Sequence, residues 1–432
     1  KKEYDHLAED EEGKEVRIAG RLMAIRGHGK ASFSTLNDRT GNIQVYFKLD
    51  VLGEQKYKEE FKRLDIGDII GIRGVVFKTR RGEVTVRVED FDLLAKALRP
   101  LPEKFHGLKD VDTRYRQRYL DLMVNLEVRE TFRKRTAILQ SIRRYLDARD
   151  FLEVETPVLS TLAGGAAARP FTTHHNALDI DLYLRIATEL SLKRLIVGGL
   201  DRVYEMGRVF RNEGIDSSHS AEFTMLEAYQ SWGDQRTIAQ LIQDIIVAAA
   251  DAVGSRQVET DQGTIDLDGQ WRWLPFFDGL SEAAGREITV ETSLEELRAV
   301  ADEREVEYDP KWNAGKLSLE LFGDLVEPRL IQPTFVHDYP SLAQPLARPH
   351  RSEPGKIEAW DLIIGGMERG TGFTELIDPV IQRDVLVRQS LAAAAGDPEA
   401  MQLDEDFLEA LEYGAPPMGG LGLGIDRLVM LL

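Results

Sequence analysis

The sequence pattern changes near residue 100, and this change constrains the fold more than any other feature of the chain. Before it, residues 15–95 alternate apolar and polar side chains in short runs separated by glycines, which is typical of short β-strands. The segment Leu98–Pro102 carries two prolines, which interrupt regular structure. After it, patterns of long helices mix with strands. The 432 residues are therefore expected to form at least two domains.

The N-terminal segment has the pattern of a small barrel. Five short strands, with one helical stretch from Glu54 to Leu64, suit the oligonucleotide-binding type of five-stranded barrel. Residues 1–100 carry a net charge of +2, whereas the remaining chain carries −21. The overall charge of −19 therefore does not argue against a nucleic-acid partner at the barrel.

The composition excludes several classes of protein. The absence of cysteine excludes disulfides, thiolate zinc sites, iron–sulfur clusters and thiol nucleophiles, and it suits a reducing, cytoplasmic location. No apolar run reaches the length of about 18 residues that a membrane span needs. The first residues, Lys1–Asp5, are charged and lack a secretory pattern. They also lack an initiating methionine, so we expect a few residues to precede them.

The remaining chain predicts an α+β domain. Apolar residues between 132 and 146 recur at helical spacing, and an apolar strand follows at 151–157. Helical patterns fill 236–252 and 293–330, and strands dominate elsewhere up to about residue 378. Because strands and helices do not alternate regularly, we expect an antiparallel sheet flanked by helices.

A glycine-rich strand, Gly419–Gly424, leads into a helix that is expected to start near Asp426. Such a junction lets the backbone approach a phosphate group, and Arg427 adds a permanent cation in the first helical turn. Close packing of the strand against the helix is the alternative interpretation of these glycines.

Two hairpins carry further candidate residues. In the first, spanning residues 203–229, period-two alternation puts an arginine and an acid on one strand face and two aromatics with an acid on one face of the return strand. These residues are Arg211 and Glu213, then Phe223, Glu227 and Tyr229. They could form a pocket for a charged planar ligand or a salt-bridged solvent face. In the second, Trp360–Glu375, carboxylates in apolar strands require a metal ion or a basic ligand.

These segments resemble, in the right order, the three signature motifs of class II aminoacyl-tRNA synthetases. The motifs correspond to the helix and strand that end at Pro157, the Phe210–Glu213 hairpin and the Gly419–Arg427 segment. Within that class the chain resembles the bacterial lysyl-tRNA synthetases. Further close matches are Gly164–Phe171, His174–Leu178, Lys193–Gly199, Arg116–Leu122 and Ile331–Phe335. The resemblance extends from the first barrel strand to the last residue.

The resemblance implies the roles of the site residues. Those implied to bind ATP are Arg211, Glu213, His219, Phe223, Asp361 and Arg427, with Arg211 and Arg427 as catalytic residues. Those implied to bind lysine are Gly165, Glu189, Arg211, Tyr229, Thr371, Phe373 and Glu375. Those implied to hold magnesium are Asp361 and Glu368. In the barrel, Phe33 and Gln44 match anticodon-binding positions.

The resemblance also implies a domain organisation and an activity. We expect an anticodon-binding barrel at 1–98, a linker at 99–126 and a catalytic domain at 127–432 with a helical insertion at about 236–330. The implied activity is lysine–tRNA ligase, with ATP, Mg²⁺, L-lysine and tRNA(Lys) as reactants in a homodimer. An acidic pocket formed by Glu189 and Glu375 suits the ammonium group of lysine and argues against aspartate as substrate.

The chain departs from the usual family pattern at a few positions. The loop Asp216–Ala221 lacks an arginine before His219, Thr371 stands where many members have Asn, and Asp361 replaces a Glu. The sequence ends a few residues into the third-motif helix, so we expect a further segment beyond Leu432.

Two other functions are open to such a chain. A paralogue could lysylate a protein, lipid or small molecule, but that acceptor would have no anticodon for the barrel to bind. A paralogue could also bind RNA without catalysis, but four charged residues of the catalytic motifs are retained. These residues are Arg211, Glu213, Glu368 and Arg427.

Overall fold

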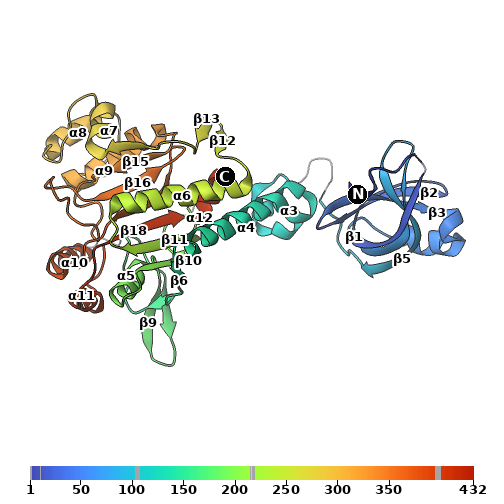
Figure 1. The fold of residues 1–432 in the computed structure, drawn as a ribbon, viewed down its shortest axis with the longest axis horizontal. Coiled ribbons are helices and arrows are strands. Elements are labelled where there is room, and N and C mark those ends of the chain that lie inside the picture. Colours follow the sequence, from blue (N-terminus) through green and yellow to red (C-terminus); the bar gives the residue numbers. More distant parts are fainter. Residues whose placement is uncertain (1, 10, 103–107, 215, 217–218, 395–399) are drawn as a thin grey trace. The chain divides into compact units, whose positions relative to one another are not determined.

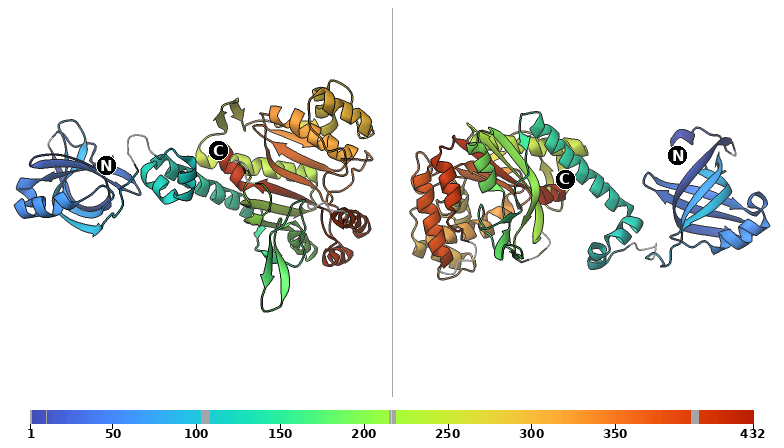
Figure 2. Two further views of the ribbon diagram at one scale, coloured as in Figure 1. Left: turned by 180° about the vertical axis from the view of Figure 1, so that it is seen from behind. Right: turned by 90° about the horizontal axis from the view of Figure 1, so that it is seen from below.

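The computed structural model describes residues 2–9, 11–102, 108–214, 216, 219–394 and 400–432. The chain divides into two compact units, Lys1–Thr131 and Phe132–Leu432, which are described separately (Figures 1 and 2). Within the described residues, no helix is both long and apolar enough to cross a membrane.

The first unit contains a closed five-stranded barrel, as the sequence predicts. The strand order is β1-β2-β3-β5-β4, and the pairings are antiparallel except for β3 with β5. The strands are β1 (Glu12–His28), β2 (Ala31–Asp38), β3 (Gly41–Lys48), β4 (Ile69–Lys78) and β5 (Val84–Ala95). The helical stretch predicted at 54–64 is present, because residues 54–63 are helical throughout, with a π-helical part (Lys56–Glu60) and a 3-10 part (Phe61–Arg63). The short helix α1 (Leu49–Leu52) precedes it.

Strand alternation separates the inside of the barrel from its surface. On β3, Val45 and Phe47 are fully buried, whereas Gln44 and Tyr46 alternate with them on the outer face. In the core, the Phe47 ring stacks on Phe61 at a centroid distance of 4.3 Å and meets the edge of Phe91 at 5.6 Å. The interior is therefore filled by side chains, and ligand contacts must come from the outer face.

The segment predicted as a linker, 99–126, contains two short helices. They are α2 (Val111–Arg116) and α3 (Arg118–Val124), and α4 (Leu126–Asp147) follows. The fully buried Asp121 accepts hydrogen bonds from Arg114 at 2.9 Å, from Asn125 at 2.7 Å and from Arg118. This charge network connects α2 with α3, which the sequence pattern did not indicate.

The second unit is built on an eight-stranded sheet with the order β14-β15-β16-β17-β18-β11-β10-β6. Its central pairings are antiparallel, as predicted, but the outer pairs β14–β15 and β10–β6 are parallel, so the sheet is mixed. The strands are β6 (Leu152–Glu153), β10 (Arg202–Phe210), β11 (Glu222–Ser231), β14 (Arg272–Pro275), β15 (Thr334–His337), β16 (Ala359–Ile363), β17 (Glu368–Thr374) and β18 (Met418–Gly424).

The helix α6 (Gln235–Val253) crosses one face of this sheet (Figure 1). Its buried Ile238, Ile242 and Ile246 pack in one core cluster with Leu226 and Leu421 from strands β11 and β18. Because successive residues of a strand point to opposite faces, the neighbours of these strand residues line the other face of the sheet. The candidate site is built on that face.

The segment 236–330, predicted as a helical insertion, is not purely helical. It contains α6, α7 (Phe276–Ala284), α8 (Leu294–Glu303) and α9 (Ala314–Leu325), together with a hairpin of β12 (Gln257–Thr260) and β13 (Gly263–Asp266). It also supplies β14, which extends the main sheet beside β15. The segment is therefore partly an extension of the central sheet.

Smaller elements complete the second unit. A three-stranded sheet is formed by β7 (Leu159–Ser160), β8 (Thr172–His175) and β9 (Ile180–Leu184), and its β8–β9 hairpin projects from the unit (Figure 2). The remaining helices are α5 (Glu189–Val197), α10 (Pro379–Ala394), α11 (Glu405–Glu412) and α12 (Ile425–Leu431), and 3-10 turns lie at Lys2–Tyr4 and Glu327–Arg329.

We predict that Phe47→Ala destabilises the barrel alone. Loss of a fully buried aromatic side chain typically costs roughly 3–5 kcal/mol. Hydrogen exchange of barrel amides should accelerate. The unfolding transition followed by tryptophan fluorescence should keep its wild-type midpoint denaturant concentration, because all five tryptophans lie in the second unit. A matched Phe33→Ala change on the outer face should leave both measurements close to wild type, and equal effects of the two changes would contradict the core assignment.

Candidate active site

Two rows of cross-strand neighbours line the sheet face opposite α6. One row joins four strands through Glu227, Gly422, Thr371 and Asp361. The next row joins Tyr229, Gly420 and Phe373. Residues facing each other across antiparallel strands point to the same side of a sheet. The register therefore gathers candidate residues from widely separated parts of the sequence.

The glycines of β18 leave room between these side chains. A Cβ atom on Gly420 would lie 2.1 Å from Glu375 Oε1 and 2.3 Å from Tyr229 Cε1. At Gly422 a Cβ would meet nothing closer than 3.8 Å. The requirement for glycine at position 420 therefore comes from side-chain packing in this pocket.

A buried ion cluster closes one end of the second row. Glu189, the first residue of α5, and Glu375, which follows β17, both contact the ammonium group of Lys193. The distance from Lys193 Nζ to Glu189 Oε1 is 2.6 Å. Burial raises the pKa of Glu375 well above its usual value, and the positive charge of Lys193 opposes that rise. Glu375 Oε1 is buried without a hydrogen-bond partner in the described structure.

Glu227 is a third buried carboxylate beside this cluster. It accepts hydrogen bonds from the Thr188 backbone N–H at 3.0 Å and from the Tyr229 hydroxyl at 3.3 Å. Among the described residues it forms no ion pair. Burial, with the negative charge of Glu189, raises the pKa of Glu227 to about 7. This carboxylate can therefore accept a ligand cation.

Residues of the first hairpin lie near these rows, since the positive charge of Arg211 acts on Glu227. Their position differs in one respect from the prediction. Strand β10 ends at Phe210, so Arg211 and Glu213 lie beyond the strand and not on one of its faces. The Arg211 guanidinium lies 5.3 Å from the centre of the Phe223 ring, and Glu213 accepts a hydrogen bond from the Arg169 backbone at 3.4 Å. An arginine stacked against an aromatic ring suits a ligand with both charged and planar parts.

The third motif brings a second arginine to the site. Arg427, in α12, donates to the backbone oxygen of Glu368 at 2.9 Å, and its Nη2 lies 3.1 Å from His219 Nε2. The His219 ring in turn contacts Asp216 at 2.8 Å. Ser217 and Ser218 of the same loop lie outside the described residues. The structure therefore brings the second and third motifs into contact.

A pair of carboxylates occupies the β16–β17 hairpin. Burial and the charge of Glu368 raise the pKa of Asp361 to about 7. Glu327 approaches the same hairpin and accepts the Glu368 backbone N–H at 3.1 Å. Of the two carboxylates, Asp361 forms no ion pair among the described residues, and Glu368 Oε2 lies 3.8 Å from Arg427 Nη1. Their hard oxygen atoms fit Mg²⁺, which binds a few carboxylates together with substrate phosphates.

The remaining predicted pocket residues lie beside these groups. Gly165 has a φ of 88°, a conformation that favours glycine, and a Cβ there would lie 3.4 Å from the Glu189 Cβ. The Thr371 hydroxyl donates to the Trp360 carbonyl at 3.3 Å and is a hydrogen-bond partner of Asp361. Thr371 therefore connects the pocket with the carboxylate pair.

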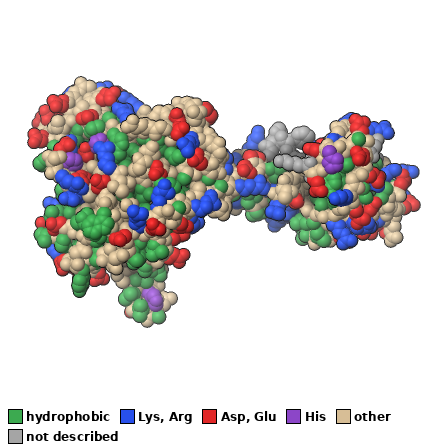
Figure 3. Space-filling view, viewed as in Figure 1, with side chains coloured by type: hydrophobic (Ala, Val, Ile, Leu, Met, Phe, Trp, Pro, Cys, Tyr) green, Lys and Arg blue, Asp and Glu red, His purple; other side chains and the backbone are tan. Residues whose placement is uncertain are grey.

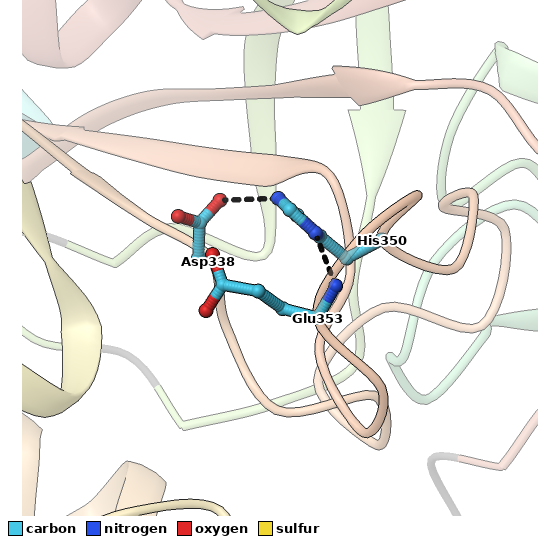
Figure 4. Close-up of side chains that lie close together, drawn as sticks. All are labelled: Asp338, His350 and Glu353. Atoms are coloured by element: carbon cyan, nitrogen blue, oxygen red, sulfur yellow. Dashed lines mark hydrogen bonds and ion pairs between the residues drawn. The ribbon is translucent and has the colours of Figure 1, made fainter.

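Three polar side chains elsewhere in the second unit also lie close together: Asp338, His350 and Glu353 (Figure 4). His350 Nδ1 accepts the Glu353 backbone N–H at 3.0 Å, and His350 Nε2 faces Asp338 Oδ1 at 3.7 Å. Lys356 Nζ lies 2.6 Å from Glu353, so this carboxylate is already paired with a cation. We interpret the group as a structural link within the 338–357 loop.

The barrel presents an aromatic surface on its outer face. Phe33 pairs with Tyr46 across β2 and β3, and their rings stack at 4.5 Å, with Phe77 at 6.2 Å from Tyr46. Gln44 lies on the same face and accepts a hydrogen bond from Thr85 at 2.9 Å. Lys and Arg side chains lie among Asp and Glu side chains over the face shown in Figure 3. Stacked rings with a nearby amide suit unpaired bases.

Glu227 is predicted on the hairpin face that could form a pocket, but without a ligand role. Lys193, Glu327 and the barrel residue Tyr46 are not predicted as site residues. The spacing of four residues between Glu189 and Lys193 was a usable signal, because it places both on one face of a helix, whereas Glu327 carried no such signal. Tyr46 was recognised only as part of a strand.

Comparison with known proteins identifies the family. The model of the family described as "tRNA synthetases class II (D, K and N)" matches residues 110–432. The model of the family described as "OB-fold nucleic acid binding domain" matches residues 16–94. The chain therefore belongs to the class II tRNA synthetases, with an OB-fold at its N-terminal end.

Similarity to curated relatives identifies the group within this class. The chain is 53% identical to lysine–tRNA ligase of Moorella thermoacetica over 98% of this chain and 86% of the relative. It is 50% identical to lysine–tRNA ligases of Halalkalibacterium halodurans and Bacillus subtilis, over 100% and 98% of this chain and 87% and 85% of the relatives. Within the class, it falls in the lysine–tRNA ligase group.

We predict that Gly420→Ala disrupts the pocket. The added methyl group cannot fit beside Glu375 and Tyr229 without displacing one of them. The melting temperature of the second unit should fall, and ligand binding in this pocket should be lost. Gly422→Ala is the matched control for the melting temperature, because its methyl group meets only ordinary van der Waals contacts. A Gly420→Ala protein whose melting temperature equals that of this control would contradict the described packing.

Proposed function

We propose that the chain is a lysine–tRNA ligase, which activates L-lysine with ATP and transfers it to the 3′ end of tRNA(Lys). The observation that carries the proposal is the set of buried carboxylates Glu189, Glu227 and Glu375 around Tyr229. A buried ammonium group needs such partners, and each charge-assisted hydrogen bond contributes roughly 1.5–3 kcal/mol. The lysine–tRNA ligases among the relatives support the same substrate.

In this proposal the amino acid lies along the two glycine-containing rows. The side-chain ammonium of lysine is held by Glu375, Glu227 and Tyr229, while Phe373 packs against the methylene groups. The amino group of the substrate faces Glu189 and the backbone at Gly165. Its carboxylate faces Arg211, because a guanidinium group can bind a carboxylate through two parallel hydrogen bonds.

The nucleotide lies beside the hairpin residues. Adenine stacks on Phe223, and Glu213 and His219 hold the nucleotide. Arg211 contacts the α-phosphate, and Arg427 contacts the γ-phosphate end. Asp361 and Glu368 would hold Mg²⁺ against the phosphates, and the bound ion would supply compensation of their negative charge. Class II synthetases use ATP and a divalent metal in general. The residues named here are those that we propose to bind the nucleotide and the metal in this chain.

The reaction needs no general base in its first step. The lysine carboxylate is already ionised and attacks the α-phosphorus of ATP, so that lysyl-adenylate forms and pyrophosphate leaves. A hydroxyl of the tRNA 3′ end then attacks the acyl carbon, and AMP leaves. Arg211 and Arg427 position the reacting groups and stabilise charge that develops on the phosphate oxygens.

The barrel supplies the second contact with tRNA. Phe33 and Gln44 bind anticodon bases, with Tyr46 extending the stacking surface. Stacking of one base on an aromatic side chain contributes roughly 1–3 kcal/mol. Domain boundaries at 98 and 126 remain part of the proposal.

We also propose a homodimer formed through the first motif, which comprises α4 and β6. Strand β6 is the last strand of the sheet order, and Leu152 on it is 51% exposed. A cyclic pair is the commonest symmetry for such a contact. Sedimentation at twice the chain mass of 48.8 kDa would support the dimer. A cytoplasmic location stays a prediction from the composition.

Lysine-dependent exchange of pyrophosphate into ATP tests the function, followed by charging of tRNA(Lys). Exchange with subsequent charging supports the proposal. Exchange without charging would indicate another acceptor, and absence of exchange would indicate an RNA-binding protein without catalysis.

We predict that Glu375→Gln raises the KM for lysine by roughly 10- to 100-fold, the loss expected for one charge-assisted hydrogen bond. The KM for ATP should change little, because Glu375 lies in the amino-acid part of the pocket. Pyrophosphate exchange with each substrate varied in turn measures both constants. Equal losses for lysine and ATP would contradict the pocket assignment.

We predict that the KM for lysine falls about tenfold between pH 6 and pH 8, because Glu227 has a pKa of about 7 and attracts the substrate cation only when ionised. The Glu227→Gln variant cannot ionise at this position. Its KM should be high and nearly independent of pH over that range. A pH dependence that survives this substitution would assign the titration to another group.

A further inference from the structure

Lys193 is a buried cation at the centre of the amino-acid pocket. It lies one helical turn after Glu189 on α5, and its side chain is only 1% exposed. Its ammonium group bridges Glu189 and Glu375, and it lies 5.6 Å from the Phe373 ring centre and 6.0 Å from that of Phe407. Lysine is almost never fully buried unless it is paired.

The partners of Lys193 are the groups that the proposed function assigns to the substrate. Both oxygens of Glu375 are buried without a hydrogen-bond partner in the described structure, but Lys193 forms an ion pair with Oε2, whereas Oε1 approaches Gly420 and the Tyr229 ring. One oxygen of this carboxylate therefore binds the internal cation, and the other is left for a ligand.

The charges of the pocket match a ligand with two ammonium groups. Three buried carboxylates, those of Glu189, Glu227 and Glu375, carry three negative charges when ionised, and Lys193 compensates one of them. Tyr229 stays neutral because burial raises its pKa well above the usual value. Arg211 is assigned to the carboxylate of the substrate. Two uncompensated negative charges remain, and lysine carries two ammonium groups.

We propose that Lys193 is a positioning and specificity-determining residue, which fixes Glu375 through one oxygen and sets the pocket charge to that of a diammonium amino acid. This inference rests on the proposed function and deepens it. Burial opposes the charged form of Lys193, but the two carboxylates outweigh burial and raise its pKa, so the internal cation is permanent.

Removal of Lys193 should weaken lysine binding through protonation. Without the cation, Glu189 and Glu375 face each other in a buried site, and one of them takes up a proton, as close carboxylates do. A protonated carboxyl group attracts an ammonium group less strongly than a carboxylate does. If the Lys193 ammonium group instead occupied the position at which the substrate ammonium group binds, removal of Lys193 would strengthen lysine binding.

The test uses the full chain with Lys193→Met, which keeps an unbranched side chain against Phe373 and Phe407. We expect the KM for lysine in pyrophosphate exchange to rise roughly 10- to 100-fold at pH 7, as for loss of one charge-assisted contact, and the KM for ATP to stay within about twofold. The loss should shrink as the pH rises to 9, because the paired carboxylates ionise again. Calorimetric titration with lysine gives the same comparison without catalysis.

Arg194→Met is the matched control. It removes a cation from the next position of the same helix, where Arg194 contacts Asp404 at 3.0 Å, so lysine and ATP constants should stay at wild-type values. An unchanged or lower KM for lysine in Lys193→Met, or equal losses for lysine and ATP, would overturn the inference.

If Lys193→Met does not fold, a double variant tests the proposed role of Lys193. Glu189→Gln combined with Lys193→Met removes one charge of each sign and restores two uncompensated negative charges. Its KM for lysine should be lower than that of Glu189→Gln alone, and an equal or higher value would overturn the inference. A wild-type chain without lysine-dependent exchange would refute the proposed function itself, whereas normal exchange with an unaffected Lys193→Met protein would refute only the role of Lys193.

Discussion

Buried negative charge is the constraint on which the catalytic unit depends. Glu189, Glu227 and Glu375 lie on the sheet face opposite α6, where water cannot solvate them fully, and Lys193 is the internal cation of this cluster. Burying a charge without a partner is costly, so such a pocket is complete only with a cationic ligand. The proposed preference for an amino acid with a positively charged side chain follows from the need to balance these buried negative charges.

The central sheet makes this arrangement possible by serving two purposes at once. Leu421 and Leu423 of β18 face the core beneath α6, whereas Gly420 and Gly422 between them leave space on the opposite face. A strand with this alternation stabilises the fold through one face and receives ligands on the other. The Asp361–Glu368 pair lies on the next hairpin of the sheet, so the proposed metal site and the proposed amino-acid site share one scaffold.

The strands of the barrel likewise have one face in the core and one face at the surface, where nucleic acid is proposed to bind. Phe47 fills the interior, while Phe33 and Tyr46 stack on the outer face. The alternation on β3 was readable from the sequence, and so was the closed five-stranded fold, because both depend on local period-two patterns. Which of the outward aromatics stack on one another depends on the β2–β3 register, and that register is visible only in the folded barrel.

The sequence by itself determined the two-unit organisation, the family and the motif residues, because these depend on patterns that neighbouring residues carry. Only the tertiary structure decided that Arg211 and Glu213 lie beyond β10, that β14 joins the main sheet, and that Lys193 binds both Glu189 and Glu375. The contact between Lys193 and Glu375 joins residues separated by most of the catalytic unit. Its existence depends on strand register and helix docking, which no local pattern encodes.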